Sequence, residues 1–161
     1  MVDDIPGLRR ILATSRVVAV VGLSGDWFRP SYFAAKYMQE HGYTLLPVNP
    51  RYPEILGETC YPTLTEAREK SGLAIDIVDV FRKASDVPPI ADEAIAVGAK
   101  VLWQQLGVNH AEAVKKAEAA GLECVVDRCV KIEHARLFGG LNWAGVNTRV
   151  ISAKRPRWLA N

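Results

Sequence analysis

Short apolar runs alternate with helical segments along this chain, and this alternation constrains the fold more than any other feature of the sequence. The runs are brief, continuous and rich in valine, isoleucine and leucine, which is typical of strands that helices cover on both faces. They lie at residues 17–22, 44–48, 75–81, 100–104 and 122–126. The sequence therefore predicts five strands with a helix between each pair.

The helices between these runs have readable ends. Pro30 suits a first helical turn, and Thr63 with Glu66 fits a capping box, as does Asn109 with Glu112. Each of four successive helices is followed by a glycine suited to the position after a helix end, namely Gly42, Gly72, Gly98 and Gly121. We expect helices near 5–14, 30–41, 63–71, 85–97 and 109–120.

Alternating strands and helices of this length imply parallel strand pairing with right-handed crossovers. We predict a single Rossmann-like α/β domain, a doubly wound sheet of about five parallel strands, over residues 1–138. Residues 139–161 form a C-terminal extension with a basic segment, Lys154–Trp158. The sequence leaves open whether this extension is a packed arm or a disordered end.

The composition is that of an ordinary soluble globular protein of 161 residues, 49% hydrophobic and 24% charged. The longest apolar run is too short to span a bilayer, and the acidic N-terminus is unlike a secretory signal, so we expect a cytoplasmic protein without membrane contact. A net charge of +2 gives no case for nucleic-acid binding. Three cysteines without a Cys-x-x-Cys pair and three scattered histidines predict neither a disulfide framework nor a metal site.

The first apolar run ends in a glycine turn, Gly22-Leu23-Ser24-Gly25, and Pro30 soon begins a helix. A buried strand, a tight glycine turn and a helix start form a phosphate cradle in many α/β proteins. The turn lets backbone N–H groups approach an anion, and the helix N-terminus contributes favourable partial charge.

Polar residues also follow the other predicted strands. Because ligands of open parallel sheets bind beyond the carboxyl ends of the strands, these residues are expected to gather at one edge. The segments concerned are Asn49-Pro50-Arg51, Phe81-Arg82-Lys83, Gln105-Leu106-Gly107 and Asp127-Arg128-Cys129. Their cations, amides and thiol suit a multiply phosphorylated nucleotide.

The dinucleotide fingerprint Gly-x-Gly-x-x-Gly is broken, because Ser24 and Trp27 occupy its second and third glycine positions. The acidic residue that accepts from the ribose of NAD is replaced by Asn49. Arg51 could contact a ribose phosphate, so an NADP-dependent oxidoreductase stays open as an alternative.

Five segments in order carry a resemblance to a known family. They are Gly22–Gly25 with Arg29-Pro30-Ser31, Pro47–Pro50, Asp79–Arg82, Leu102–Gly107, and Asp127–Cys129 with Glu133-His134. Over residues 5–138 the chain resembles small stand-alone CoA-binding proteins, which are similar to the CoA-binding N-terminal domain of the succinyl-CoA synthetase α-subunit. The resemblance implies a protein that binds coenzyme A, or a short acyl-CoA, through its 3′-phospho-ADP portion without catalysing a reaction.

The resemblance also implies a role for each segment. The turn from Gly22 through Ser24 and Gly25 to Arg29 would hold phosphate, and Asn49, Pro50 and Arg51 would form a second nucleotide-contacting loop. Val80, Phe81 and Arg82 would line the adenine side, and Gln105 with Gly107 would meet the pantetheine arm.

Cys129 would lie at the thiol end of the bound CoA. Arg128 beside it would lower the thiol pKa if the two side chains met. This gives a third hypothesis, a redox or regulatory protein in which Cys129 forms a mixed disulfide with CoA. Cys124, within a strand, is instead expected to be a buried small hydrophobe.

Overall fold

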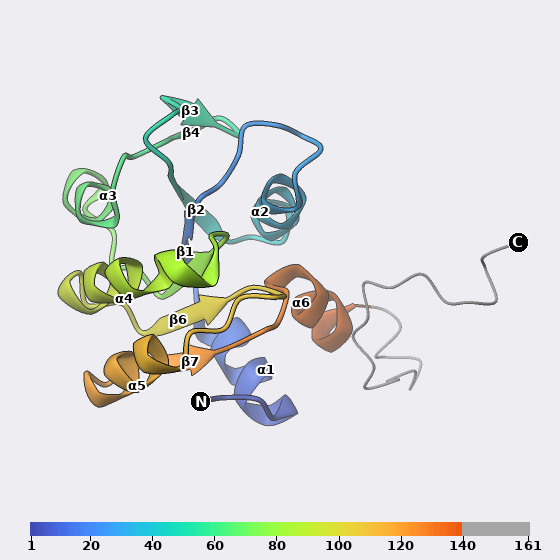
Figure 1. The fold of residues 1–161 in the computed structure, drawn as a ribbon. Helices are drawn as coiled ribbons and strands as arrows, with labels where there is room; N and C mark the ends of the chain where they lie inside the picture. Colours follow the sequence, from blue (N-terminus) through green and yellow to red (C-terminus); the bar gives the residue numbers. More distant parts are fainter. Residues whose placement is uncertain (140–161) are drawn as a thin grey trace, which may run out of the picture.

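The computed structural model describes residues 1–139, and its centre is a parallel sheet of five strands in the order β2-β1-β5-β6-β7 (Figure 1). The strands are β1 (Val17–Val21), β2 (Thr44–Val48), β5 (Ile77–Val80), β6 (Val101–Gln104) and β7 (Glu123–Val125). Every pair of neighbours in this sheet is parallel. The predicted doubly wound α/β class is therefore confirmed.

Both faces of the sheet are buried, since alternate strand residues point to two separate clusters of apolar side chains. Val18 and Trp103 pack beneath α1 (Ile5–Thr14), α2 (Pro30–Glu40) and α6 (Val130–Phe138). Ala19 and Leu102 pack on the other face beneath α3 (Leu64–Ser71), α4 (Val87–Ala96) and α5 (Ala111–Ala119). Burial on both faces explains why the strands are apolar throughout rather than alternating.

The third strand was predicted at residues 75–81. In the structure it is β5 (Ile77–Val80), so it begins two residues later and ends one residue earlier than predicted. The Asp76 carboxylate accepts hydrogen bonds from the backbone N–H groups of Arg16 (2.8 Å) and Val17 (3.0 Å). Asp76 thus uses its side chain to fasten the amino ends of β1 and β5 together. Lys100 pairs with its other oxygen at 2.7 Å.

Half of the capping box predicted at Thr63 is confirmed, because the Thr63 hydroxyl caps the helix by accepting from the Glu66 N–H at 3.1 Å, whereas the Glu66 carboxylate pairs with Lys70. The one predicted at Asn109 is wrong. His110 caps α5 instead, and its Nδ1 accepts from the Ala113 N–H at 3.2 Å. The His110 N–H in turn donates to Gln104 Oε1 at 3.0 Å, which places the start of the helix one residue later than the pattern suggests.

Two small elements add to the predicted plan. A 3₁₀ turn, Ala84–Asp86, leads into α4, and β3 (Glu54–Ile55) pairs antiparallel with β4 (Glu58–Thr59) in a ribbon beyond the carboxyl end of β2. Neither was predicted, because each is too short to leave a periodic pattern.

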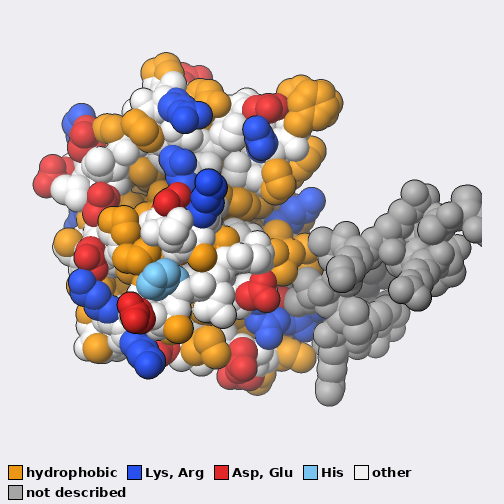
Figure 2. Space-filling view, viewed as in Figure 1, with side chains coloured by type: hydrophobic (Ala, Val, Ile, Leu, Met, Phe, Trp, Pro, Cys, Tyr) orange, Lys and Arg blue, Asp and Glu red, His pale blue; other side chains and the backbone are white. Residues whose placement is uncertain are grey.

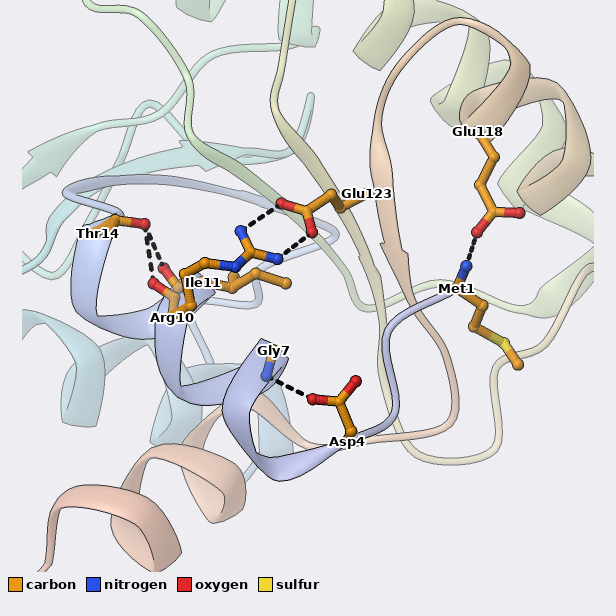
Figure 3. A network of polar contacts seen from close by, with 8 residues as sticks. All are labelled: Met1, Asp4, Gly7, Arg10, Ile11, Thr14, Glu118 and Glu123. Carbon is orange, nitrogen blue, oxygen red and sulfur yellow. Dashed lines mark hydrogen bonds and ion pairs between the residues drawn. The ribbon is translucent and has the colours of Figure 1, made fainter.

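The N-terminal segment is fastened by polar contacts (Figure 3). The Asp4 carboxylate caps α1 by accepting from the Gly7 N–H at 2.6 Å. The Arg10 guanidinium forms a bidentate ion pair with Glu123 of β7, and the terminal ammonium of Met1 forms an ion pair with Glu118 of α5. These contacts hold α1 against the edge of the sheet at β7.

The chain leaves β1 for β2 on one side and later reaches β5 on the other, so the topological switch point lies between β1 and β5. Within residues 1–139, no helix is long and apolar enough to cross a membrane. The predicted C-terminal extension, apart from Gly139, lies outside the described residues.

Candidate functional site

The glycine turn after β1 touches the loop after β5 across the switch point. Gly22 has a φ of +86°, and a Cβ placed on it would lie 2.5 Å from the Phe81 carbonyl oxygen and 2.9 Å from Arg82 Nε. Its N–H donates to the Val48 carbonyl at 2.9 Å. Glycine is required here by both the left-handed backbone and the close approach of Phe81.

Side-chain hydrogen bonds fix the rest of the turn in one shape. The Ser24 N–H donates to the Ser31 hydroxyl, and the Ser24 hydroxyl accepts from the Asp26 N–H, both at 3.1 Å. The Asp26 carboxylate accepts from the Phe28 N–H at 3.0 Å and lies 3.9 Å from Arg29 Nε. The turn is therefore shaped before any ligand arrives, and it leads directly into the first turn of α2.

The loop after β2 packs against this turn. Asn49 is buried, its amide Nδ2 donates to the Leu23 carbonyl at 2.9 Å, and its Oδ1 accepts from the Arg51 N–H at 3.0 Å. A Cβ on Gly25 would lie 2.9 Å from the Tyr52 ring. Asn49 and Gly25 thus join the two loops.

These loops enclose a polar compartment of about 390 Å³ at the carboxyl ends of β1, β2 and β5. Most of the residues predicted for the phosphate turn and the second nucleotide loop line it, together with two predicted for the adenine side: Gly22, Ser24, Arg29, Asn49, Arg51, Phe81 and Arg82. Three arginines against one aspartate, Asp26, make it favourable for an anion. In the view of Figure 2, Lys and Arg side chains gather near the middle of the face that is shown, close to the start of α4.

An apolar compartment of about 720 Å³ continues from the polar one, since both are lined by Pro30, Phe81 and Arg82. Its further walls come from the loop after β6 and from the start of α6, and they include Gln105, Leu106, Val108, Cys129 and Ile132. The two compartments form one groove along the carboxyl edge of the sheet.

A side compartment of about 410 Å³ opens toward the other helix layer. Its walls include Val21, Val48, Leu64, Pro89 and Ile90, with Thr63 and Glu93 as polar members. Arg82 lines this compartment as well as the other two. Arg82 is therefore the residue at which all three compartments meet.

Four of the predicted residues do not line these compartments. Val80 is fully buried within the sheet, and Gly25 faces Tyr52. Pro50 is exposed between Asn49 and Arg51. The Gly107 N–H donates to Asp127 Oδ1 at 2.7 Å, so its backbone amide is engaged by the protein itself.

Asp79 holds the groove residue Gln105 in place, and sequence reasoning gave it no role of its own. It is 1% exposed, and its Oδ1 accepts from Gln105 Nε2 at 2.6 Å. Burial raises the pKa of the Asp79 carboxyl to about 7. The sequence did hold a signal for a buried carboxyl group. Asp79 stands inside the apolar run Ile77-Val78-Asp79-Val80, and a strand of this kind is covered on both faces, so its one charged residue must be buried.

Cys129 lines the apolar compartment, but the Arg128 guanidinium that could have lowered its pKa bonds elsewhere. The Arg128 guanidinium donates instead to Glu133 Oε1 and to the Asp3 carbonyl, each at 3.1 Å. Burial raises the pKa of the Cys129 thiol, although backbone groups of Ile132 and Lys131 act in the opposite direction. Cys124 is fully buried, as predicted, and burial raises its thiol pKa to about 11.

Comparison with known proteins places this chain in a family. YneT of Bacillus subtilis (strain 168) is 38% identical over 128 residues, which cover 80% of this chain and 92% of that protein. A solved structure of a hypothetical protein from Pyrococcus horikoshii OT3 superposes with a TM-score of 0.80 at 39% identity, covering 85% of this chain and 94% of that one.

An ADP-forming acetate–CoA ligase of Archaeoglobus fulgidus is 32% identical over 121 residues. This match covers 71% of the present chain but only 18% of the ligase. Residues 16–135 match the family described as CoA binding domain, and they include the whole sheet and every loop of the groove. The chain therefore belongs to the CoA-binding domain family.

Proposed function

We propose that this protein binds coenzyme A, or a short acyl-CoA, through its 3′-phospho-ADP portion and catalyses no reaction of its own. The observation that carries the proposal is the groove of two joined compartments, one cationic and one apolar, at the switch point of a CoA-binding domain fold. CoA has the same division, because a highly charged nucleotide continues into a long uncharged arm.

The polar compartment suits the phosphates. The turn around Ser24 leads into the N-terminus of α2, whose dipole favours an anion, and Arg29 and Arg51 supply positive charge. Arg82, at the junction, is placed by the proposal on the 3′-phosphate. The pantetheine arm would then follow the apolar compartment past Gln105 toward Cys129.

Binding of CoA, dephospho-CoA and NADPH, measured by isothermal titration calorimetry, tests the proposal. CoA should bind more tightly than dephospho-CoA, because the latter lacks the 3′-phosphate and its charge-assisted contacts. NADPH binding tighter than CoA would favour the alternative, an NADP-dependent oxidoreductase, and would overturn the proposal.

The role of Arg82 has its own test. Arg82→Ala should weaken CoA binding on the order of tenfold or more while changing dephospho-CoA binding much less. Arg68→Ala is the matched control, since Arg68 lies on α3 and lines none of the three compartments. Equal losses for both ligands would reject the assignment of Arg82 to the 3′-phosphate.

A second candidate function follows from the position of Cys129 in the apolar compartment. The Cys129 thiolate would attack CoA disulfide, form a mixed disulfide with one CoA and release the other as its thiolate, so that no further oxidant is needed. Intact mass spectrometry after incubation with CoA disulfide should then show one reducible adduct. No adduct, or an adduct that persists in Cys129→Ser, would refute this role.

A further inference from the structure

A separate pocket lies at the opposite edge of the sheet from the groove, beside the amino ends of β1 and β2. Its volume is about 290 Å³, and its walls come from the ends of α1, α2 and α6. Its polar lining residues are Ser15, Arg16, His41, Tyr43 and His134. Among the described residues that line it, none is acidic. The proposed CoA site uses no part of this pocket.

Two of the lining residues are buried and keep an unused polar atom. Ser15 is 4% exposed and His134 is 9% exposed. Within residues 1–139, the Ser15 hydroxyl makes no hydrogen bond, and neither does the Nε2 atom of His134. Buried polar groups are nearly always hydrogen-bonded, so these two atoms require a polar partner inside the pocket.

The contact with Tyr37 makes His134 a hydrogen-bond donor toward the pocket. The Tyr37 hydroxyl lies 3.0 Å from His134 Nδ1 and has no other hydrogen-bond partner in the described part of the chain. Its proton is therefore assigned to this bond, which leaves the proton of the neutral imidazole on Nε2. Burial and the nearby His41 lower the pKa of the His134 imidazole, so it is neutral at neutral pH.

Arg16 supplies the pocket with a positive charge that is partly free. Its Nη1 donates to the carbonyls of Ala13 (2.9 Å) and Ser15 (2.8 Å). Its Nη2 and Nε make no hydrogen bond or ion pair within residues 1–139. Burial raises the pKa of Tyr43 to about 12, and the Arg16 charge acts in the opposite direction. The guanidinium thus lies near enough to Tyr43 to act on the contents of the pocket.

Carbonyl groups at the ends of α1 and α2 would disfavour an anion if they were free, but the protein engages them. The Leu12 carbonyl accepts from the Tyr43 hydroxyl at 2.6 Å, and the Tyr37 carbonyl accepts from His41 Nδ1 at 2.7 Å. The buried groups left free are therefore a hydroxyl and an imidazole N–H, with the Arg16 guanidinium beside them. A carboxylate accepts from all three kinds of donor.

The remaining walls are apolar. Leu12 and Phe138 line the pocket, and the Arg9 guanidinium lies 5.4 Å from the centre of the Phe138 ring, where it adds positive charge. An inorganic anion would leave these apolar walls in contact with water. An organic anion with a short hydrocarbon part would cover them.

We propose that this pocket binds a small organic carboxylate. The carboxylate accepts from Arg16, from the Ser15 hydroxyl and from His134 Nε2, and the hydrocarbon part packs against Leu12 and Phe138. This site is independent of the proposed CoA function, because the two share no residue.

The first test compares butyrate with butyramide, which have the same hydrocarbon part but differ in charge. The wild-type protein should bind butyrate roughly tenfold more tightly or better, because the amide forms no charge-assisted hydrogen bonds. NMR signals of the histidine rings locate the site. Those of His134 should move with butyrate, whereas those of His110, which caps α5 and does not line this pocket, should stay. Equal affinities, or His134 signals that do not move, would overturn the proposal.

Inorganic phosphate tests whether the apolar walls matter. It should shift the His134 signals only at concentrations well above those of butyrate. If phosphate binds as tightly as butyrate, the pocket does not select an organic anion and the proposal is wrong. Neither of these comparisons needs a variant, so neither depends on the folding of one.

Two variants identify the donors. Ser15→Ala removes a hydroxyl that makes no hydrogen bond within residues 1–139, so it should fold normally and weaken butyrate binding by about fivefold. Arg16→Gln should weaken it roughly tenfold or more while changing butyramide binding little. Arg68→Gln is the matched control, since Arg68 lies on α3 and does not line the pocket. Chemical denaturation checks that each variant is folded. An unchanged butyrate affinity in either Ser15→Ala or Arg16→Gln would overturn the assigned contacts.

Discussion

Gly22 lies against the carbonyl oxygen of Phe81 so closely that a Cβ on Gly22 would be 2.5 Å from it. This contact joins the first loops on either side of the switch point, and the same two loops form the floor of the polar compartment. The shape of the groove thus depends on the absence of one side chain.

Gly22→Ala should lower the free energy of unfolding and abolish CoA binding. The left-handed backbone costs about 1–2 kcal/mol for alanine, and the overlap with Phe81 adds to that. Gly42→Ala is the matched control, because Gly42 has a similar φ of +89° but no atom within 4 Å of its Cβ position. Chemical denaturation and calorimetry should show strain in both variants and loss of binding in Gly22→Ala alone. Retained CoA binding in Gly22→Ala would contradict this view of the turn.

Asp79 should make the stability of the protein fall as the pH rises. Its pKa is raised from 3.8 to about 7 by burial, so between these values the folded state binds more protons than the unfolded state. Asp79→Asn removes this effect while keeping an oxygen for Gln105 Nε2. The variant should therefore gain on the order of 2–4 kcal/mol over the wild type between pH 4 and pH 8, measured by denaturation at each pH. A constant difference across this range would refute the prediction.

Two carboxylates that pair with arginines should differ sharply in their importance. Glu133 is fully buried between Arg128 and Arg136, with distances of 3.1 Å to Arg128 Nη1 and 3.2 Å to Arg136 Nε. Glu133→Gln leaves two partly buried cations without a counter-charge and should cost about 3 kcal/mol of stability. Glu123→Gln breaks a largely exposed pair with Arg10 and should cost about 1 kcal/mol or less. Similar losses in the two variants would contradict this ranking.

The reaction of Cys129 with CoA disulfide should be slow at neutral pH and should accelerate as the pH rises. Burial raises the pKa of this thiol, so a smaller fraction of it is the reactive thiolate at a given pH than for an ordinary cysteine. The rate of adduct formation can be measured by mass spectrometry at several pH values between about pH 7 and pH 10. Saturating reduced CoA should protect Cys129 if both occupy the apolar compartment. A rate that is independent of pH would disprove the prediction.

Much of the fold follows from local patterns in the sequence. The apolar runs and the glycines after the helices define the strands and helix ends, because each signal comes from a few neighbouring residues. The convergence of Ser24, Arg51 and Arg82 on one compartment was predictable for a topological reason. Parallel strands bring their carboxyl ends to one edge, so the segments that follow them must meet there.

The remaining features depend on packing that a linear pattern does not encode. Arg128 pairs with Glu133 rather than with its neighbour Cys129, because α6, which begins at Val130, brings the buried Glu133 carboxylate within 3.1 Å of Arg128 Nη1. The side compartment brings Glu93 of α4 to the first residue of α3, two positions 29 residues apart. Neither relationship can be seen before the helices are placed on the sheet.

The switch point between β1 and β5 also divides the sheet mechanically. From β1 the chain runs to β2 on one side, then crosses to β5 and continues to β6 and β7 on the other, so the loops that meet here belong to different halves of the sheet. A ligand bound by Arg51 on one side and by Gln105 on the other would connect the two halves of the sheet. Occupancy of the groove would then resist mechanical separation of β1 from β5, in addition to the backbone hydrogen bonds that already join these two strands.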